Sequence, residues 1–231
     1  TRNMVDAALS HGVRRFVYTS TIDVFEAGTG ATYDESVLAT APRASAYERS
    51  KQNADRVVTD ALARGLPAVF LHPSAVYGPG PTTSRTLNEL FQDLAARRIP
   101  ALLPGGMPVV LASDVGEGHV LAWEKAAVGA RYILSDAYFT LRELASAVKD
   151  VIPGARVPPV IPLWAATAVA VTGEALSSVT RRAPLVTRDQ LHFLAWQARP
   201  SSARAQRELD WHPTPLRLGL PLLLAPRPST A

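Results

Sequence analysis

Two apolar segments on either side of one long amphipathic helix constrain the fold of this chain most. Residues 15–19 and 67–71 are short runs of apolar and aromatic side chains, as in buried strands. Between them, residues 46–63 carry apolar side chains at the 3.6-residue period of a helix, and Gly65 follows as a stop signal. Strand, helix and strand in this order form the βαβ unit of a parallel sheet. The sequence therefore predicts an α/β fold built around a parallel sheet.

The same alternation continues along the chain. Residues 26–45 are rich in glycine, alanine, threonine and proline and are expected to form a loop. Two capping boxes, Asp114 with Glu117 and Thr140 with Glu143, predict the starts of helices. The last third of the chain is rich in proline, and its pattern predicts short helices. Further helices and strands are expected at residues 4–9, 87–94, 115–123, 131–134 and 141–148.

The composition indicates a globular protein without cysteine chemistry. The 231 residues, 47% hydrophobic and 19% charged, suffice for one large or two small domains. The absence of cysteine excludes disulfides, cysteine-ligated zinc and a cysteine nucleophile. The five histidines show no metal-ligand spacing, so we expect no metal site.

Charge and hydropathy limit the partners further. The formal net charge is +4 and the basic residues are scattered, which argues against a nucleic-acid partner. The longest apolar run, residues 157–171, is interrupted by three prolines, so we expect no transmembrane segment and interpret the run as a buried or groove-lining helix. The chain has no cysteine and no secretory signal pattern, and we therefore expect a cytoplasmic location.

Tyr47 and Lys51 form the most informative pair in the sequence. Residues four apart on a helix project from the same face. A neighbouring ammonium favours the phenolate and lowers a tyrosine pKa from its ordinary value of about 10, so such a pair suits proton transfer. Only three of the 24 lysine and arginine residues are lysines, so a lysine four residues after a tyrosine is less expected by chance.

The context of this pair resembles a known family. A hydroxyl-rich segment at a strand end comes before the Tyr–Lys helix, and a turn with the sequence HPSAVYGPG comes after it. In this order the motifs resemble the extended short-chain dehydrogenase/reductase superfamily, the NAD-dependent epimerase/dehydratase group. The resemblance covers nearly the whole chain. The matching segments are TRN at 1–3, YTSTIDVF at 18–25, HPSAVYGPG at 72–80, VLASDVGEGH at 110–119 and SARAQRELDWHP at 202–213.

The resemblance implies a role for each matching residue. Tyr47 would be the general acid/base, and Lys51 would hold the nicotinamide ribose and lower the pKa of Tyr47. Thr21 would hydrogen-bond the substrate oxygen, with Ser20 as the alternative hydroxyl. His72, where relatives usually have arginine, is interpreted as a packing residue. The cofactor NAD or NADP would pass along a turn made of Pro73, Ser74, Ala75 and Val76.

The resemblance also implies a fold and a division of the chain. It implies the C-terminal portion of a doubly wound Rossmann sheet, followed by a small, mainly helical substrate domain. Residues 1–150 would form the partial NAD(P)-binding domain, with some segments between 80 and 150 in the substrate lobe. Residues 151–231 would form the substrate-binding region.

One expected element is absent from the sequence. The family binds its dinucleotide through a glycine-rich turn after the first strand, and no GxxGxxG or GxGxxG occurs in the 231 residues. We therefore expect the opening βαβ units of the family to be missing and the chain by itself to be inactive. The choice between NAD and NADP stays open for the same reason.

Two branches of the family compete. Ala75 stands where sugar-nucleotide enzymes often carry asparagine, and Phe25 replaces their usual tyrosine, which favours the dihydroflavonol-reductase-like and 3β-hydroxysteroid-dehydrogenase-like side. The predicted reaction is hydride transfer to or from an apolar secondary alcohol or ketone. A nucleotide-sugar epimerase or dehydratase is the alternative within the superfamily, and a non-catalytic remnant or cofactor sensor is the alternative outside enzymes. A homodimer is compatible with the resemblance. An apolar pocket would be lined by Ile161, Leu163, Trp164, Val169 and Val171.

Overall fold

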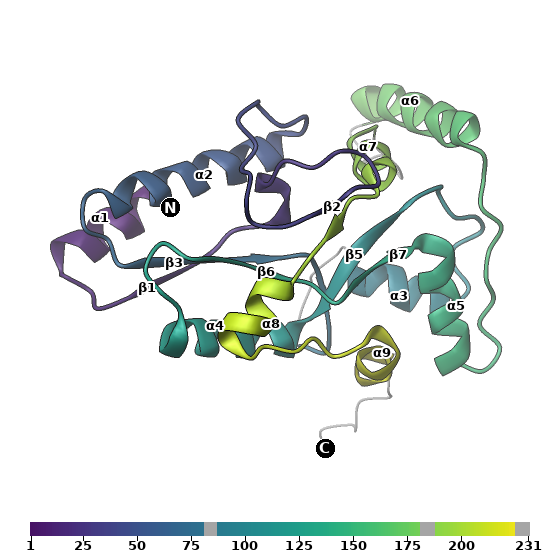
Figure 1. The fold of residues 1–231 in the computed structure, drawn as a ribbon. Helices are drawn as coiled ribbons and strands as arrows, with labels where there is room; N and C mark the ends of the chain where they lie inside the picture. Colours follow the sequence, from purple (N-terminus) through teal and green to yellow (C-terminus); the bar gives the residue numbers. More distant parts are fainter. Residues whose placement is uncertain (81–86, 181–187, 225–231) are drawn as a thin grey trace, which may run out of the picture.

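The computed structural model describes residues 1–80, 87–180 and 188–224, in which helices surround two three-stranded sheets (Figure 1). The first sheet has the order β1-β3-β6, and both of its strand pairs are parallel. The predicted α/β fold with a parallel sheet is therefore confirmed. Within the described residues β1 pairs only with β3. The strands of this sheet are β1 (Phe16–Thr19), β3 (Ala68–Pro73) and β6 (Arg131–Leu134).

Helices cover both faces of this sheet, as expected for a doubly wound arrangement (Figure 1). The helices α1 (Arg2–Ser10) and α2 (Ala46–Leu62) pack on one face, and α4 (Ala112–Lys125) and α8 (Ala203–Leu209) pack on the other. The central strand β3 is apolar on both sides, because successive side chains of a strand point to opposite faces. Its contacts alternate accordingly, toward α1 and α2 for Ala68 and Phe70 and toward α4 and α8 for Val69 and Leu71.

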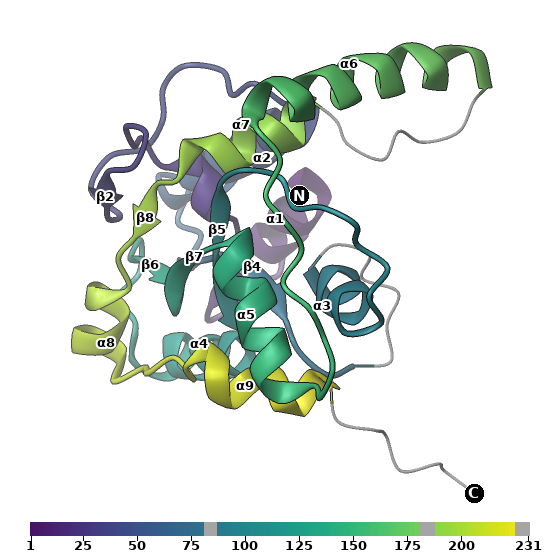
Figure 2. The same ribbon diagram turned by 90° about the vertical axis from the view of Figure 1, so that its right-hand side faces the viewer.

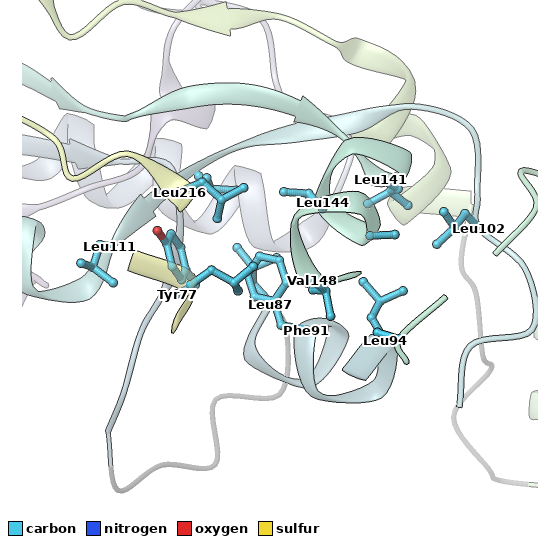
Figure 3. Packing of buried hydrophobic residues seen from close by; sticks show 14 of the residues in the cluster. Tyr77, Leu87, Phe91, Leu94, Leu102, Leu111, Leu141, Leu144, Val148 and Leu216 are labelled. Carbon is cyan, nitrogen blue, oxygen red and sulfur yellow. The ribbon is translucent and has the colours of Figure 1, made fainter. Parts of the chain in front are cut away.

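The second sheet belongs to a separate hydrophobic cluster. The strands β4 (Ala75–Tyr77) and β5 (Gly106–Leu111) are parallel, and β7 (Ala137–Thr140) runs antiparallel to β5. Three helices pack on this sheet and on one another: α3 (Leu87–Ala95), α5 (Leu141–Val151) and α9 (Leu216–Leu224). Figure 3 shows their buried side chains, which include Tyr77, Phe91, Leu94, Leu144, Val148 and Leu216.

Only one of the two predicted capping boxes forms. The Thr140 hydroxyl accepts from the Glu143 backbone N–H, and the Glu143 carboxylate accepts from the Thr140 N–H, so this box opens α5 as predicted. The prediction of a capping box at Asp114 is wrong, because α4 begins at Ala112 and no side chain caps its N-terminus. The Asp114 carboxylate instead accepts two hydrogen bonds from Thr214, at 2.6 Å from the backbone N–H and 3.0 Å from the hydroxyl.

The proline-rich last third contains the predicted short helices and one long helix that was not predicted. The helix α6 (Leu163–Thr180) has 18 residues and extends away from the rest of the protein, as Figure 2 shows. It is followed by α7 (Arg188–Trp196) and the short strand β8 (Arg199–Pro200). The strand β8 pairs in parallel with β2 (Thr32–Tyr33), a strand inside the segment expected to be only a loop. No helix in the described ranges has both the length and the apolar character needed to cross a membrane.

The larger apolar side chains at the start and middle of α6 are exposed, and their role as a pocket lining stays a prediction. Leu163 and Trp164 are 54% and 76% exposed, and Val169 and Val171 are 45% and 47% exposed. Among the α6 side chains that the structure describes, the small residues Ala166 and Ala170 are buried, and they pack with Leu191 of α7 and partly buried Ile161. The exposure of Leu163, Trp164, Val169 and Val171 argues against the buried alternative for these side chains, and the groove-lining alternative stays a prediction.

Helices that follow residue 150 pack against elements that precede it. The helix α8 returns to the first sheet, where buried Leu209 and Trp211 pack with Tyr132 and Leu134 of β6. The helix α9 returns to the second sheet and to α5. The division into residues 1–150 and 151–231 stays a prediction about domains.

Candidate active site

The candidate site lies where the chain leaves β1 and packs against the start of α2. After β1, the short 3-10 helix η1 (Ile22–Val24) is buried against α2. Thr21 is its N-cap, with an extended backbone and a side chain that is only 7% exposed. The carboxyl end of a parallel strand is where ligands bind in open α/β sheets, so the position of Thr21 suits a site residue.

Tyr47 and Lys51 lie in the first turns of α2. Ser45 caps this helix, because its hydroxyl accepts from the Glu48 N–H at 3.1 Å while the Glu48 carboxylate accepts from the Ser45 N–H at 2.9 Å. Tyr47 is 60% exposed, and the Lys51 ammonium lies 5.7 Å from the centroid of its ring. No hydrogen bond or ion pair to another described residue engages the ammonium.

The pKa of Tyr47 shifts in the direction opposite to the one the sequence predicts. Partial burial raises it above its ordinary value of 10.0, and the negative charge of Asp23 adds to the increase. The Lys51 ammonium lies at the ring and makes no hydrogen bond to the phenol oxygen. The expected lowering is therefore not found, and the acid/base role of Tyr47 stays a prediction.

Asp23 is a site residue that sequence reasoning missed. It is 8% exposed, and its Oδ2 accepts a 2.9 Å hydrogen bond from the Thr21 hydroxyl, whereas Oδ1 is buried with no partner among the described residues. Burial raises the pKa of Asp23 from 3.8 to about 6, although the hydrogen bond from Thr21 opposes the shift. The signal in the sequence was one acidic residue inside the apolar run Ile22-Asp23-Val24-Phe25.

The structure also separates the two candidate hydroxyl groups. The Ser20 hydroxyl donates to Asp55 of α2 at 2.7 Å, and Ser20 is only 4% exposed. Thr21 follows it and lies next to the unpartnered Asp23 oxygen. Arg43 binds the backbone of this segment, because its guanidinium donates to the backbone oxygens of Asp23 and Phe25.

The turn expected to face the cofactor joins β3 to β4. Pro73 ends β3, and the Ser74 N–H continues the pairing by donating to Leu134 O at 3.0 Å. The Ser74 hydroxyl is buried without a partner among the described residues, and Val76 is 38% exposed. A buried polar atom without a partner costs free energy, so this hydroxyl suits a polar ligand. Ala75 begins β4 opposite Val109.

His72 is more than a packing residue. It is fully buried, and its ring contacts Phe25 with the two ring centroids 4.5 Å apart. Its Nδ1 lies 3.1 Å from the backbone oxygen of Thr21, and its Nε2 lies 3.3 Å from Arg131 Nη1. The sequence identified its burial but not these two polar contacts.

Comparison with known proteins identifies the group to which these features point. A family model described as "NAD dependent epimerase/dehydratase family" matches residues 1–134. The chain is 28% identical over 216 residues to a Synechocystis protein whose name provisionally assigns it as a dihydroflavonol 4-reductase. The match covers 90% of this chain and 63% of that relative.

Solved structures share the fold. The crystal structure of gox2253 superposes with a TM-score of 0.78 at 29% identity, covering 97% of this chain and 69% of that one. The structure of DesIV, a dTDP-glucose 4,6-dehydratase from Streptomyces venezuelae with NAD and TYD bound, superposes with a TM-score of 0.71. Its identity is 19%, covering 96% of this chain and 62% of that one, so it is similar in fold alone.

Proposed function

Because the chain belongs to the NAD-dependent epimerase/dehydratase family, we propose that it carries the acid/base half of an NAD(P)-dependent oxidoreductase. The proposed reaction is hydride transfer to or from an apolar secondary alcohol or ketone. One observation carries the proposal: exposed Tyr47, Thr21 and a Lys51 ammonium without a hydrogen bond or ion pair to any other described residue occupy neighbouring elements at the carboxyl end of β1. A proton donor, a cation and a hydroxyl together are what carbonyl reduction requires from a protein.

The chain's residues fit one end of the dinucleotide. Lys51 would hold the nicotinamide ribose, and the turn from Pro73 to Val76 would lie along the nicotinamide. The Ser74 hydroxyl, which is without a partner among the described residues, would offer a hydrogen bond there. When bound, the nicotinamide donates or accepts the hydride. No residues of a glycine-rich pyrophosphate turn occur in this sequence, so the proposal assigns no group to the pyrophosphate.

In the proposed mechanism, Tyr47 gives its phenol proton to the substrate oxygen during reduction and takes it back during oxidation. Burial and Asp23 hold the pKa of Tyr47 above its ordinary value, which keeps the phenol protonated for the reduction. The Lys51 ammonium, 5.7 Å from the ring centroid, is placed to favour the phenolate that follows, although it does not outweigh burial and the charge of Asp23. The Thr21 hydroxyl donates to Asp23 Oδ2 and accepts from the Asp23 N–H at 3.4 Å, so one lone pair of its oxygen is left to accept from a substrate alcohol.

The substrate class is proposed from one position and one relative. Ala75 offers no amide to a sugar-nucleotide diphosphate, and the provisional name of the Synechocystis relative belongs to a reductase. The exposed side chains of α6 do not contribute to this argument. A nucleotide-sugar substrate is the outcome that would replace an apolar ketone or alcohol.

The test uses the product of the complete reading frame, purified and screened with NAD and NADP against apolar ketones, their alcohols and nucleotide sugars. Tyr47→Phe is expected to lower kcat at least about 100-fold, because only the phenol oxygen transfers the proton. Lys51→Ala is expected to weaken cofactor binding and to lower kcat as well. Matched controls are Tyr138→Phe, whose hydroxyl has no partner among the described residues, and exposed Lys149→Ala. Most of the wild-type kcat remaining in Tyr47→Phe would remove Tyr47 from the mechanism, and turnover of nucleotide sugars alone would refute the substrate class.

A further inference from the structure

A closed chain of polar contacts lies beneath the candidate site. The Ser20 hydroxyl donates to Asp55 Oδ2 at 2.7 Å, and Asp55 Oδ1 pairs with Arg131 Nη1 at 2.9 Å. The same Arg131 nitrogen lies 3.3 Å from His72 Nε2. His72 Nδ1 lies 3.1 Å from the backbone oxygen of Thr21, which follows Ser20 in the chain. These five residues, here called the Thr21 ring, join the end of β1 to β3, β6 and α2.

The hydrogens of the Thr21 ring have one consistent arrangement. A guanidinium is always protonated and only donates, so His72 Nε2 accepts from Arg131. Nδ1 then carries the imidazole hydrogen and donates to the oxygen of Thr21. Burial and the charge of Arg131 lower the pKa of His72 to about 3, which keeps the ring in this neutral form. Each contact in the cycle therefore has a donor and an acceptor.

The Thr21 ring is shielded from water and held on several sides. Ser20, Asp55 and His72 are at most 4% exposed, and the Arg131 side chain is 11% exposed. The Arg131 guanidinium lies 4.0 Å from the Phe70 ring centroid, and its Nη2 donates to the Thr59 hydroxyl at 2.6 Å. Removing one member would leave a buried polar group of its neighbour unpaired, which costs free energy, so the contacts of the ring support one another.

The sheet itself does not hold the Thr21 carbonyl. The last backbone hydrogen bond from the end of β1 to β3 comes from the Ser20 N–H, which donates to Leu71 O at 2.8 Å. Thr21 follows with an extended backbone at the start of η1, beyond the strand register, which ends at Thr19 opposite Leu71. As the N-cap of η1, Thr21 also offers its carbonyl to the first turn of that helix, and His72 supplies the side-chain donor that links the carbonyl to β3.

We propose that His72, Arg131 and Asp55 are positioning residues that set the place of Thr21 relative to the helix carrying Tyr47 and Lys51. Asp55 lies one helical turn after Lys51 on α2, so the Thr21 ring ties this helix directly to the end of β1. The proposal rests on the proposed function. A displacement of about 1 Å in a reacting group lowers rates by up to about 100-fold, so a change in the ring reaches the reaction without touching substrate.

The test compares two substitutions that break the Thr21 ring at different points. The amide nitrogen of asparagine is attached to Cγ, as Nδ1 is in histidine, so His72→Asn keeps a donor for Thr21 O and loses the contact with Arg131. The amide oxygen of glutamine lies one bond further out, near the place of Nε2, so His72→Gln keeps the acceptor for Arg131 and loses the donor to Thr21. Both variants replace the imidazole by an amide and are matched in polarity.

Both variants are made in the product of the complete reading frame, and their crystal structures, kcat, KM and cofactor affinities are measured. Thr21 is expected to move in His72→Gln and to stay in place in His72→Asn. The kcat of His72→Gln is expected to be at least about tenfold below that of His72→Asn, with equal cofactor affinity. Thr21 in the wild-type position in both structures, or equal kcat values with Thr21 displaced in one, would overturn the proposal.

A milder pair keeps the test decisive if the His72 variants do not fold. Ser20→Ala cuts the ring beside Thr21, whereas Thr59→Val removes one support of Arg131 and leaves the ring closed. Ser20→Ala is expected to have the lower kcat and a displaced Thr21, and equal behaviour of the two variants would refute the ring. The structural comparison needs no turnover, so its outcome is independent of Tyr47→Phe, which tests the proposed function.

Discussion

Asp23→Asn is expected to stabilise the protein above pH 6 and to lose this advantage at acidic pH. Burial raises the pKa of Asp23 from 3.8 to about 6. Between these two pH values the carboxyl group is protonated in the folded state and ionised in the unfolded state. Where the folded state binds more protons, stability falls as pH rises. The contribution of Asp23 is therefore most favourable below about pH 4 and is lost as pH rises to about 6. Asparagine has no charge to bury and avoids this loss.

The magnitude follows from the shift. About two pKa units at 1.36 kcal/mol each correspond to about 3 kcal/mol between the two protonation states. Near pH 4 a small part of this penalty is already present, so the stability difference between variant and wild type should change by 2 to 3 kcal/mol, roughly, between pH 4 and pH 8. Any constant cost of burying the asparagine amide cancels in this comparison.

The assay is urea unfolding of the complete protein and of Asp23→Asn at pH 4, 5, 6, 7 and 8. With an m-value of about 2–3 kcal/mol per molar urea, the midpoint difference should grow by about 1 M across the series. Asp60→Asn on the exposed side of α2 removes the same charge and serves as the control. A stability difference for Asp23→Asn that is the same at pH 4 and pH 8 would refute the reasoning.

Two further variants test local packing and capping. Ser45→Ala removes the capping box at the start of α2 and should lower the free energy of unfolding by about 1 kcal/mol, measured as a lower urea midpoint. An unchanged midpoint would contradict a stabilising role of this cap. Gly118→Ala places a methyl group 2.7 Å from Leu134 Cδ1 and should cost about 1–3 kcal/mol by thermal melting. Gly116→Ala on the same helix meets nothing within 4 Å and should be neutral or stabilising. Equal melting temperatures for the two glycine variants would contradict the contact with Leu134.

The sequence was most reliable for elements whose stability is local. The apolar period placed α2 at 46–63, and the structure has it at Ala46–Leu62. The same period did not indicate that two of the four buried residues of the helix, Gln52 and Asp55, are polar. Hydropathy identifies residues that avoid water but not polar residues that find buried partners.

The two capping boxes illustrate the limit of local reasoning. Thr140 and Asp114 stand at the same spacing from a glutamate, and both residue types cap helices well. Thr140 caps α5. The Asp114 carboxylate instead accepts hydrogen bonds from Thr214, which lies 100 positions after Asp114 in the chain. The sequence contains no sign of this competition, because Thr214 reaches Asp114 only after α8 and the segment behind it have packed on α4.

Residue spacing was enough to predict the three strands of the first sheet, the helix between the first two of them, the family resemblance and the Tyr47–Lys51 pair, because these depend on residues near one another in the chain. The tertiary structure alone decided the rest of the site: the bond of Thr21 to Asp23, the raised pKa values and the ring formed with residues 55, 72 and 131. A side chain's type sets which hydrogen bonds and charges it can offer. Its burial and its partner are set by segments that come together only in the folded sheet, and these two quantities control the pKa of a group and the atoms it can position.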